Sequence, residues 1–334
     1  GKYRASYRMP ATKHPQIVIL AAKLPASAPG WTVIYLTAKT DLPVKTDKPG
    51  VLVTLKLGDK SYGPVRTDKY GRVKIPVVVH PGQTEALAEA VDDFGNRNQR
   101  RVSIPVPNYS RLVGFAERRV LAADGLDSTD IWVIQVHADG TPVHDPAFVA
   151  YKSAGKIKKA VRIGAGLYRI RYTAPAGFEK GARLTIADKR NPEKSRKRFR
   201  FDLTTGRPEK LSIMARPQRL VADGNSQSAI TLRVADRAGN PLSEHKPRVT
   251  CSAGKVSKVL AGKKGEFGAS FTAPVYVEGP VKCMAELAGG RDEPLRTDII
   301  LQMSRPVPDK MDVEAENYEL PADGQSQLTV GIVV

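Results

Sequence analysis

The residues of this chain that could bind a transition metal are few and scattered. The five histidines are spread along the sequence, and the densest polar cluster is HADGTPVHD, which contains His137, Asp139, His144 and Asp145. A zinc site there would need ligands that converge from both arms of one hairpin. We therefore interpret the cluster as a polar turn between two strands.

The best-placed carboxylates for a calcium ion are those of Asp124, Asp127 and Asp130. A calcium site needs about 6–8 oxygen ligands, usually supplied by several acidic residues that lie close together. Asp223 and Asp323 recur at the same place in later parts of the chain without such neighbours. We expect no bound metal, with Asp124, Asp127 and Asp130 as the weak candidate.

Motifs for catalysis are absent from the sequence. It contains no G-x-S-x-G nucleophile turn, no H-E-x-x-H zinc motif, no phosphate-binding loop and no dinucleotide fingerprint. We therefore expect a protein that is not an enzyme and that uses no cofactor.

The formal net charge of +19, from 53 basic and 34 acidic residues, is the unusual feature of the composition. A basic N-terminal segment, residues 1–14, contributes to it, and the densest run is DKRNPEKSRKRFRF, residues 188–201. The candidate anion-binding residues of that run are Lys189, Arg190, Lys194, Arg196, Lys197, Arg198 and Arg200.

The basic run has two interpretations. It could bind an anionic polymer such as lipopolysaccharide, an acidic glycan or a teichoic-type polymer. It could instead be a solvated hairpin whose charges discourage edge-to-edge pairing of strands. Nucleic acid is the least favoured partner, because no helix-turn-helix, zinc finger or RNA-binding aromatic signature is present.

A similar phrase recurs along the chain at a period near one hundred residues. Asp124, Asp223 and Asp323 each lie in an Ala-Asp-Gly triplet, with spacings of 99 and 100 residues. Pro142 and Pro241 are 99 residues apart, and Pro43 lies another 99 residues earlier, at the end of a stretch, WTVIYLTAKTDLPV, that overlays IWVIQVHADGTPV. This period exceeds the roughly 20–50 residues of solenoid repeats and suits self-contained domains.

The spacing predicts three complete modules and the start of a fourth. Their expected limits are 15–107, 108–206 and 207–305, followed by the incomplete module 306–334. We expect the polypeptide to continue with more repeats. The alternative is that a neighbouring subunit completes the last module by strand addition.

Short alternating runs predict the fold of each module. Ile230, Leu232 and Val234 alternate with polar residues, which is typical of a strand with one buried face. The second module departs from this pattern, because Gln135 stands where the third has valine and both faces of the run are largely apolar. About seven such strands in each hundred residues predict all-β, tandem immunoglobulin-like (Ig-like) β-sandwich domains, arranged as beads on a rod.

The repeated phrases have a structural interpretation. In Ala-Asp-Gly, glycine supplies a positive φ and the carboxylate can accept backbone N–H groups before a strand. A later Gly-Asn-Pro closes a turn, where proline ends the pairing. The residues of this structural motif are Asp124, Gly125, Asp223, Gly224, Asp323, Gly324, Gly239, Asn240 and Pro241.

These phrases resemble those of the bacterial Ig-like repeats of invasins and intimins, which are cell-surface adhesins. The resemblance is carried by ADGNS at 222–226, by Asp236 with Gly-Asn-Pro at 239–241, and by Thr-Ala-Pro at 272–274. The third module resembles the family most, the second loosely, and the first by position alone. The resemblance implies a sandwich fold and an extracellular, cell-surface or periplasmic setting.

The two cysteines, Cys251 and Cys283, both fall in the third module, in runs that we expect to be neighbouring strands. A disulfide between them is geometrically reasonable in an oxidising compartment. The alternative is two buried free thiols, which pack as small apolar side chains.

Three functional hypotheses follow. The first is a non-catalytic structural or adhesive protein of the cell surface, a stalk, surface-layer or appendage component, with further repeats or other protein subunits as partners. The second is a binding module whose basic hairpin captures an anionic surface polymer. The third is an accessory region of a larger enzyme or toxin. No stretch approaches the roughly 18 apolar residues of a membrane-spanning helix.

Overall fold

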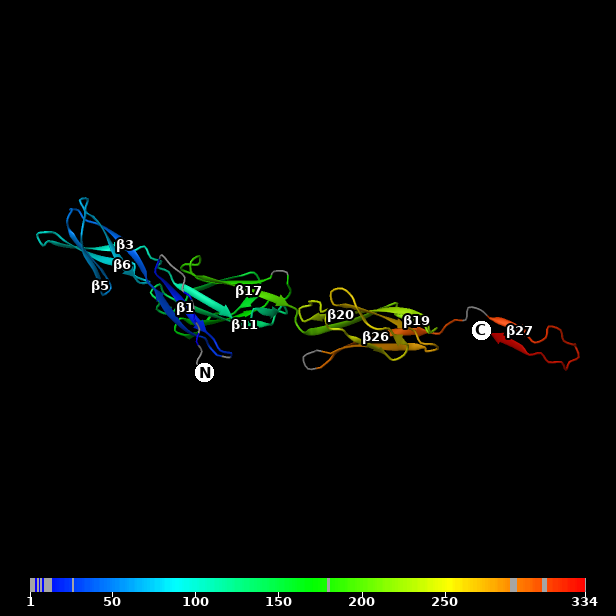
Figure 1. The fold of residues 1–334 in the computed structure, drawn as a ribbon. Coiled ribbons are helices and arrows are strands. Elements are labelled where there is room, and N and C mark those ends of the chain that lie inside the picture. Colours follow the sequence, from blue (N-terminus) through cyan, green and yellow to red (C-terminus); the bar gives the residue numbers. More distant parts are fainter. Residues whose placement is uncertain are drawn as a thin grey trace. The chain divides into compact units, whose positions relative to one another are not determined.

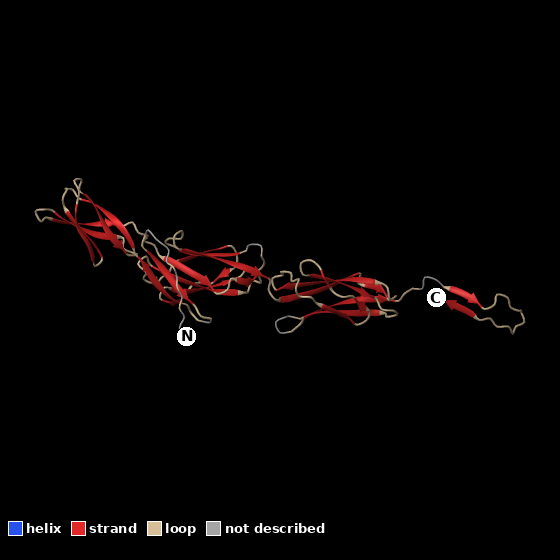
Figure 2. Ribbon diagram, in the orientation of Figure 1, coloured by secondary structure: helices blue, strands red, loops and turns tan. Residues whose placement is uncertain are grey.

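The structure of the chain is a computed structural model. It describes residues 4, 6, 8, 14–25, 27–178, 181–288, 293–307 and 311–333. The described residues form strands, turns and loops without a helix (Figure 2). No segment in this part of the chain is a helix long and apolar enough to cross a membrane. The predicted basic segment 1–14 lies largely outside the described residues.

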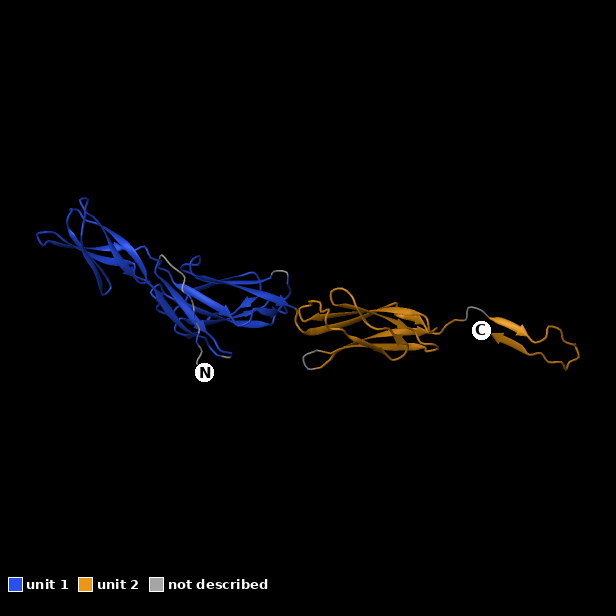
Figure 3. Cartoon of the chain, in the orientation of Figure 1, with its two compact units in different colours: residues 1–204 blue, residues 205–334 orange. Residues whose placement is uncertain are grey.

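The chain divides into two compact units, residues 1–204 and 205–334, which are described separately below (Figure 3). The first unit begins with a hairpin and continues with two sandwich modules. The second unit contains one sandwich module and one further hairpin.

The first sandwich module packs a two-stranded sheet against a four-stranded sheet (Figure 1). Alternate residues of its strands, such as Val53, Leu55, Ile75 and Val77, are buried between the sheets. The stretch 83–93 contains β7 (Glu85–Val91). The strands are β3 (Ala38–Lys45) and β6 (Arg72–Val79) in one sheet, and β5 (Lys60–Arg66), β4 (Leu52–Leu57), β7 (Glu85–Val91) and β8 (Arg97–Ser103) in the other.

The second module is a sandwich of a five-stranded and a four-stranded sheet, closed by a core in which Tyr172 and Phe201 stack at 4.6 Å between ring centroids. The five-stranded sheet contains β9 (Arg111–Ala116), β11 (Ser128–Val136), β13 (Lys156–Ile157), β14 (Val161–Gly164) and β15 (Leu167–Thr173). The four-stranded sheet contains β10 (Val120–Ala122), β12 (Phe148–Lys152), β16 (Ala182–Asp188) and β17 (Arg196–Thr204).

The module of the second unit repeats this topology strand for strand, including the parallel pairing of its short second strand with its last. One sheet contains β18 (Pro208–Arg216), β20 (Gln227–Asp236), β22 (Lys255–Val256), β23 (Leu260–Ala261) and β24 (Glu266–Thr272); the other contains β19 (Arg219–Val221), β21 (Arg248–Cys251), β25 (Gly279–Leu287) and β26 (Leu295–Ser304). A hairpin of β27 (Asp312–Ala315) and β28 (Val330–Val333) follows.

The all-β fold of tandem Ig-like sandwiches is thus confirmed, while the predicted module limits stay predictions.

An N-terminal hairpin of β1 (Gln16–Ala22) and β2 (Gly30–Leu36) lies against the second module. Ile19 and Trp31 of this hairpin pack against Trp132, Ile134 and Leu167 on the outer face of the β9–β11–β15 sheet. The sheet therefore has apolar cover on both faces.

This placement differs from the sequence-based overlay, in which residues 31–44 were matched to one continuous stretch of the second module, IWVIQVHADGTPV. Trp31 lies in the hairpin strand β2, whereas Pro43 lies in the middle of β3, opposite Lys74. The overlay relied on alternation and one proline spacing, and both are compatible with more than one strand pairing.

The covering hairpin explains why the second module lacks the alternation of the third. Along β11 every residue from Ile131 to Val136 is buried, whereas β20 alternates between buried and exposed or half-buried positions. Trp132 and Ile134 occupy the outward positions that Thr231 and Arg233 fill in β20. Apolar residues at those positions gain free energy because the hairpin removes them from water.

We predict that Ile134→Ala lowers the free energy of unfolding of the second module by about 2–5 kcal/mol, because it leaves a cavity under the hairpin. The matched control is Arg233→Ala at the equivalent outward position of the third module, where losing an exposed ion pair costs at most about 1 kcal/mol. Urea unfolding with hydrogen exchange of the strand amides measures both. Equally small effects would show that the hairpin does not cover the sheet.

Candidate functional site

The basic run 188–201 forms the end of β16, a turn and most of β17. Because side chains alternate along a strand, Phe199 and Phe201 point into the core while Arg198 and Arg200 lie exposed on the outer face. The run is therefore divided between two places, the turn at the end of the module and the outer face of the sheet.

On the outer face, arginines of neighbouring strands lie directly opposite one another. Arg200 pairs with Arg183 across β17 and β16, and Arg198 pairs with Thr185, which in turn lies opposite Tyr151 of β12. Tyr151 is 57% exposed. We refer to Arg183, Arg196, Arg198, Arg200 and Tyr151 as the arginine face.

The arginine face has little negative charge of its own. Arg196 forms an ion pair with Glu193 of the turn at 2.7 Å. Among the described residues, Arg183, Arg198 and Arg200 have no acidic side chain within ion-pair distance. The acidic residue on the outer face of these strands is Asp202, near the end of β17. Like charges directly opposite one another in a sheet are unfavourable, so this arrangement costs stability.

The turn between β16 and β17 is anchored by a buried polar network. Asp188 is 2% exposed, and its Oδ2 accepts hydrogen bonds from Ser110 Oγ and, at 2.9 Å, from Gln135 Nε2. Asp188 Oδ1 accepts the backbone N–H of Arg190 at 3.0 Å. Gln135, which stands where the third module has valine, thus helps to hold the turn through its hydrogen bond to Asp188.

One basic residue of the turn, Lys194, lies near an aromatic side chain at the start of the module. The Lys194 ammonium is 5.5 Å from the Tyr109 ring centroid, and the Arg111 guanidinium is 4.9 Å from it. Arg190 lines a neighbouring polar cavity of about 400 Å³ together with His137 and Asp139. Lys189 and Lys197 are exposed.

The HADGTPVHD cluster forms a polar turn. Asp139 Oδ1 accepts hydrogen bonds from the backbone N–H and the hydroxyl of Thr141 at 2.9 and 2.7 Å, which lower the pKa of its carboxyl below 3.8. His144 Nδ1 lies instead 2.9 Å from Arg162 Nη2. Within the described residues, no three histidine, cysteine or acidic side chains are grouped as metal ligands.

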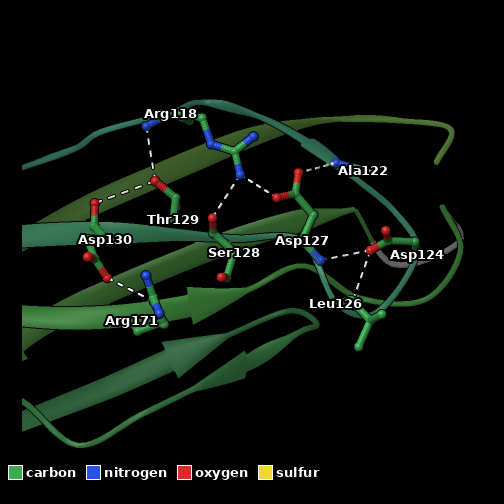
Figure 4. A network of polar contacts seen from close by, with 9 residues as sticks. All are labelled: Arg118, Ala122, Asp124, Leu126, Asp127, Ser128, Thr129, Asp130 and Arg171. Carbon is green, nitrogen blue, oxygen red and sulfur yellow. Dashed lines mark hydrogen bonds and ion pairs between the residues drawn. The ribbon is translucent and has the colours of Figure 1, made fainter. Parts of the chain in front are cut away.

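The three carboxylates of the weak calcium candidate serve different partners (Figure 4). Asp124 Oδ1 accepts the backbone N–H groups of Leu126 and Asp127 at 2.8 Å. Asp127 contacts the Arg118 guanidinium, and Asp130 forms an ion pair with Arg171 at 3.1 Å. Burial has the largest single effect on Asp127 and opposes its ionisation, but the hydrogen bonds from Arg118 and the Ala122 N–H and the charge of Arg118 together outweigh it and hold the pKa of that carboxyl below 3.8.

The repeat motif of the later modules is a turn that caps its own backbone. Asp223 Oδ1 accepts the N–H groups of Asn225 and Ser226 at 2.8 and 2.7 Å, and Oδ2 accepts the Ser226 hydroxyl. Asp323 makes the same bonds with Gln325 and Ser326. The following glycines Gly125, Gly224 and Gly324 have φ values of 79°, 80° and 69°, which L side chains rarely adopt.

The second part of the motif closes a hairpin. Asp236 accepts hydrogen bonds from both the backbone N–H and the side-chain amide of Asn240 at 2.8 Å. Gly239 between them has a φ of 91°, and Pro241 forms a bridge with Ala235. These residues shape turns, so the recurring phrases reflect the fold.

Cys251 and Cys283 lie directly opposite one another in β21 and β25, and their sulfur atoms are joined in a disulfide. The bridge links two strands of one sheet and is buried at Cys283.

Comparison with known families gives one match. Residues 207–299 match the family model described as invasin, domain 3. These residues form an invasin-type Ig-like domain. The match confirms the resemblance inferred from the ADGNS and Gly-Asn-Pro phrases. It covers only the third module, which we call the invasin-type module. No curated protein matches the chain.

Solved structures of bacterial adhesins are among those similar to the chain. Invasin, a bacterial integrin-binding protein, has 13% identity and a TM-score of 0.42, covering 95% of this chain and 67% of its own. The Escherichia coli adhesin FdeC has 14% identity and a TM-score of 0.38, covering 88% and 94%. InvD of Yersinia pseudotuberculosis has 15% identity and a TM-score of 0.34, covering 67% and 68%. These values are too low to transfer a ligand or partner.

The Asp223 turn predicts a pH dependence of the invasin-type module. Hydrogen bonds from Ser226 and Asn225 lower the pKa of the Asp223 carboxyl below 3.8, so its stabilising contribution is complete above pH 3.8 and is lost as pH falls through the lowered value. Asp223→Asn keeps an oxygen acceptor but does not titrate. We expect its urea midpoint to fall less than that of the unmodified chain between about pH 6 and pH 3; an identical fall would contradict this role.

The disulfide predicts a redox dependence confined to the same module. A bridge between residues 32 apart should stabilise it by about 3–4 kcal/mol in the chain-entropy model. Dithiothreitol should therefore lower the urea midpoint of residues 207–304 and leave residues 1–204, which contain no cysteine, unchanged. The double variant Cys251→Ala, Cys283→Ala should not respond to the reductant. A midpoint that is insensitive to dithiothreitol in the unmodified chain would count against the bridge.

Proposed function

We propose that this chain is a non-catalytic adhesive or structural segment of a bacterial cell-surface protein. The observation that carries the proposal is the match of residues 207–299 to invasin domain 3, in a module whose strand topology recurs in the second module of the chain. Repetition of one sandwich along a chain is a general way to extend a protein from a surface. Its partners are further repeats, other subunits of the surface assembly, or a receptor protein.

The repeated turns support this function, because they depend on local hydrogen bonds and on glycine conformations. In the Asp223 and Asp323 turns, the carboxylate accepts hydrogen bonds from the next residues of the same turn. Each turn is therefore shaped by its own residues, which suits a module that is repeated along a chain.

A second function is supported by the arginine face, in which the exposed Arg183, Arg198 and Arg200 have no acidic partner among the described residues. In this function the basic hairpin 188–201 captures an anionic polymer outside the cell. An accessory role beside a catalytic domain remains a third hypothesis, and finding such a domain in the same polypeptide would support it.

Surface labelling tests the first proposal. Antibodies raised against the purified chain should label intact cells of the source bacterium, and external protease should remove the signal. An antibody against a cytoplasmic protein should label the cells only after permeabilisation. Labelling by the chain-specific antibodies that also requires permeabilisation would overturn the surface assignment.

A further inference from the structure

The outer faces of equivalent sheets differ between the two modules that share one topology. In the third module, Lys282 forms an ion pair with Asp298 at 3.4 Å, and Arg296 forms one with Glu286 at 3.4 Å. Each pair joins β25 to β26, so that face is neutralised by its own cross-strand partners.

The register of the strands gives the equivalent positions in the second module. The parallel pair Val120–Asp202 corresponds to Arg219–Gln302, and the antiparallel pair Arg183–Arg200 corresponds to Lys282–Ile300. By the same register Arg198 stands at the position of Asp298, and Ala187 at that of Glu286.

The second module thus has no acidic residue at the positions of Asp298 and Glu286, and it has arginines at two positions where the third module has none. Its own acidic residue, Asp202, stands at the position of Gln302. Arg198, at the position of Asp298, has the opposite charge. Arg200 stands where the third module has the apolar Ile300. The cores beneath are alike, since Leu184 and Phe201 are buried in one module and Cys283 and Leu301 in the other. The difference is confined to side chains that point to solvent and is not required by the fold.

From this difference we infer that the arginine face binds a linear acidic polysaccharide that carries sulfate or carboxylate groups. The inference rests on the second proposed function and assigns its site to the sheet face, away from the turn. Planar guanidinium groups can each donate two parallel hydrogen bonds to such an anion. Alternate residues on a strand are about 7 Å apart and neighbouring strands about 4.8 Å apart, so the arginines present a closely spaced set of donors.

The single exposed aromatic ring on the face favours a polysaccharide over a single-stranded nucleic acid. Tyr151 lies one strand away from Arg198, across Thr185, with an accessible side chain. Single-stranded nucleic acids are bound on series of aromatic side chains on which successive bases stack. One tyrosine among arginines suits the C–H groups of a sugar ring beside its acidic substituents.

Binding of the full chain to heparin, a sulfated and carboxylated polysaccharide, tests the inference. The variant Arg198→Ala, Arg200→Ala should weaken binding at least about tenfold and lower the salt dependence, the slope of log K against log salt, by about two. The matched control Arg190→Ala, Lys194→Ala removes the same charge from the turn and should stay within about twofold of the unmodified chain. Arg198→Lys, Arg200→Lys keeps the charge but removes the planar donors, and should lie between them.

Four results would overturn the inference. They are no heparin binding by the unmodified chain, equal losses in the face and turn variants, a loss in the turn variant alone, and equally tight, equally Arg198-dependent binding of a DNA oligonucleotide. Circular dichroism and the urea midpoint of each variant show that it folds. A loss of heparin binding in the turn variant alone would be consistent with the second function but would place its site in the turn and not on the sheet face. None of these results changes the outcome of surface labelling, which tests the first function separately.

Discussion

A strand in a two-sheet sandwich can bury only one of its faces within its own module, and the rest of this structure depends on that constraint. The inward residues must fit a shared core, so they vary little in character between modules. The outward residues are free to change. In the third module many of them are polar, and they include paired charges, as with Lys282 and Asp298. In the second module one outer face is apolar and covered by a hairpin, and the other is rich in arginine.

The sequence was sufficient to predict the sandwich and its turns. Local chemistry determines them: Asp223 accepts the N–H groups of the next residues, and alternation from Ile230 to Val234 specifies one buried face. The covering hairpin could not be predicted, because nothing near Trp31 in the sequence indicates which distant sheet it contacts. The one available signal was the apolar outer face of β11, which we noted as a departure from alternation without assigning it a cover.

The basic run shows the same division between local and distant information. Its charge was evident from composition, but its separation into a turn and a sheet face depends on where β17 begins. Arg183 was missed, since it lies outside the run and joins Arg200 only through strand pairing. The signal that could have found it is the alternation of ARLTIAD, residues 182–188, beside that of KRFRF. Function in such repeat proteins is thus expected on outward positions, where one module can differ from the next without disturbing its core.

The two tryptophans of the chain, Trp31 and Trp132, both lie in the contact between the hairpin and the β9–β11–β15 sheet. Their fluorescence therefore reports on the outer-face cover without interference from other sites. The most direct test is the emission maximum of the native chain and its quenching by acrylamide, each compared with the urea-unfolded chain. If the hairpin covers the sheet, the native emission lies at shorter wavelength and is protected from quenching. Native emission and quenching equal to those of the unfolded chain would contradict the account.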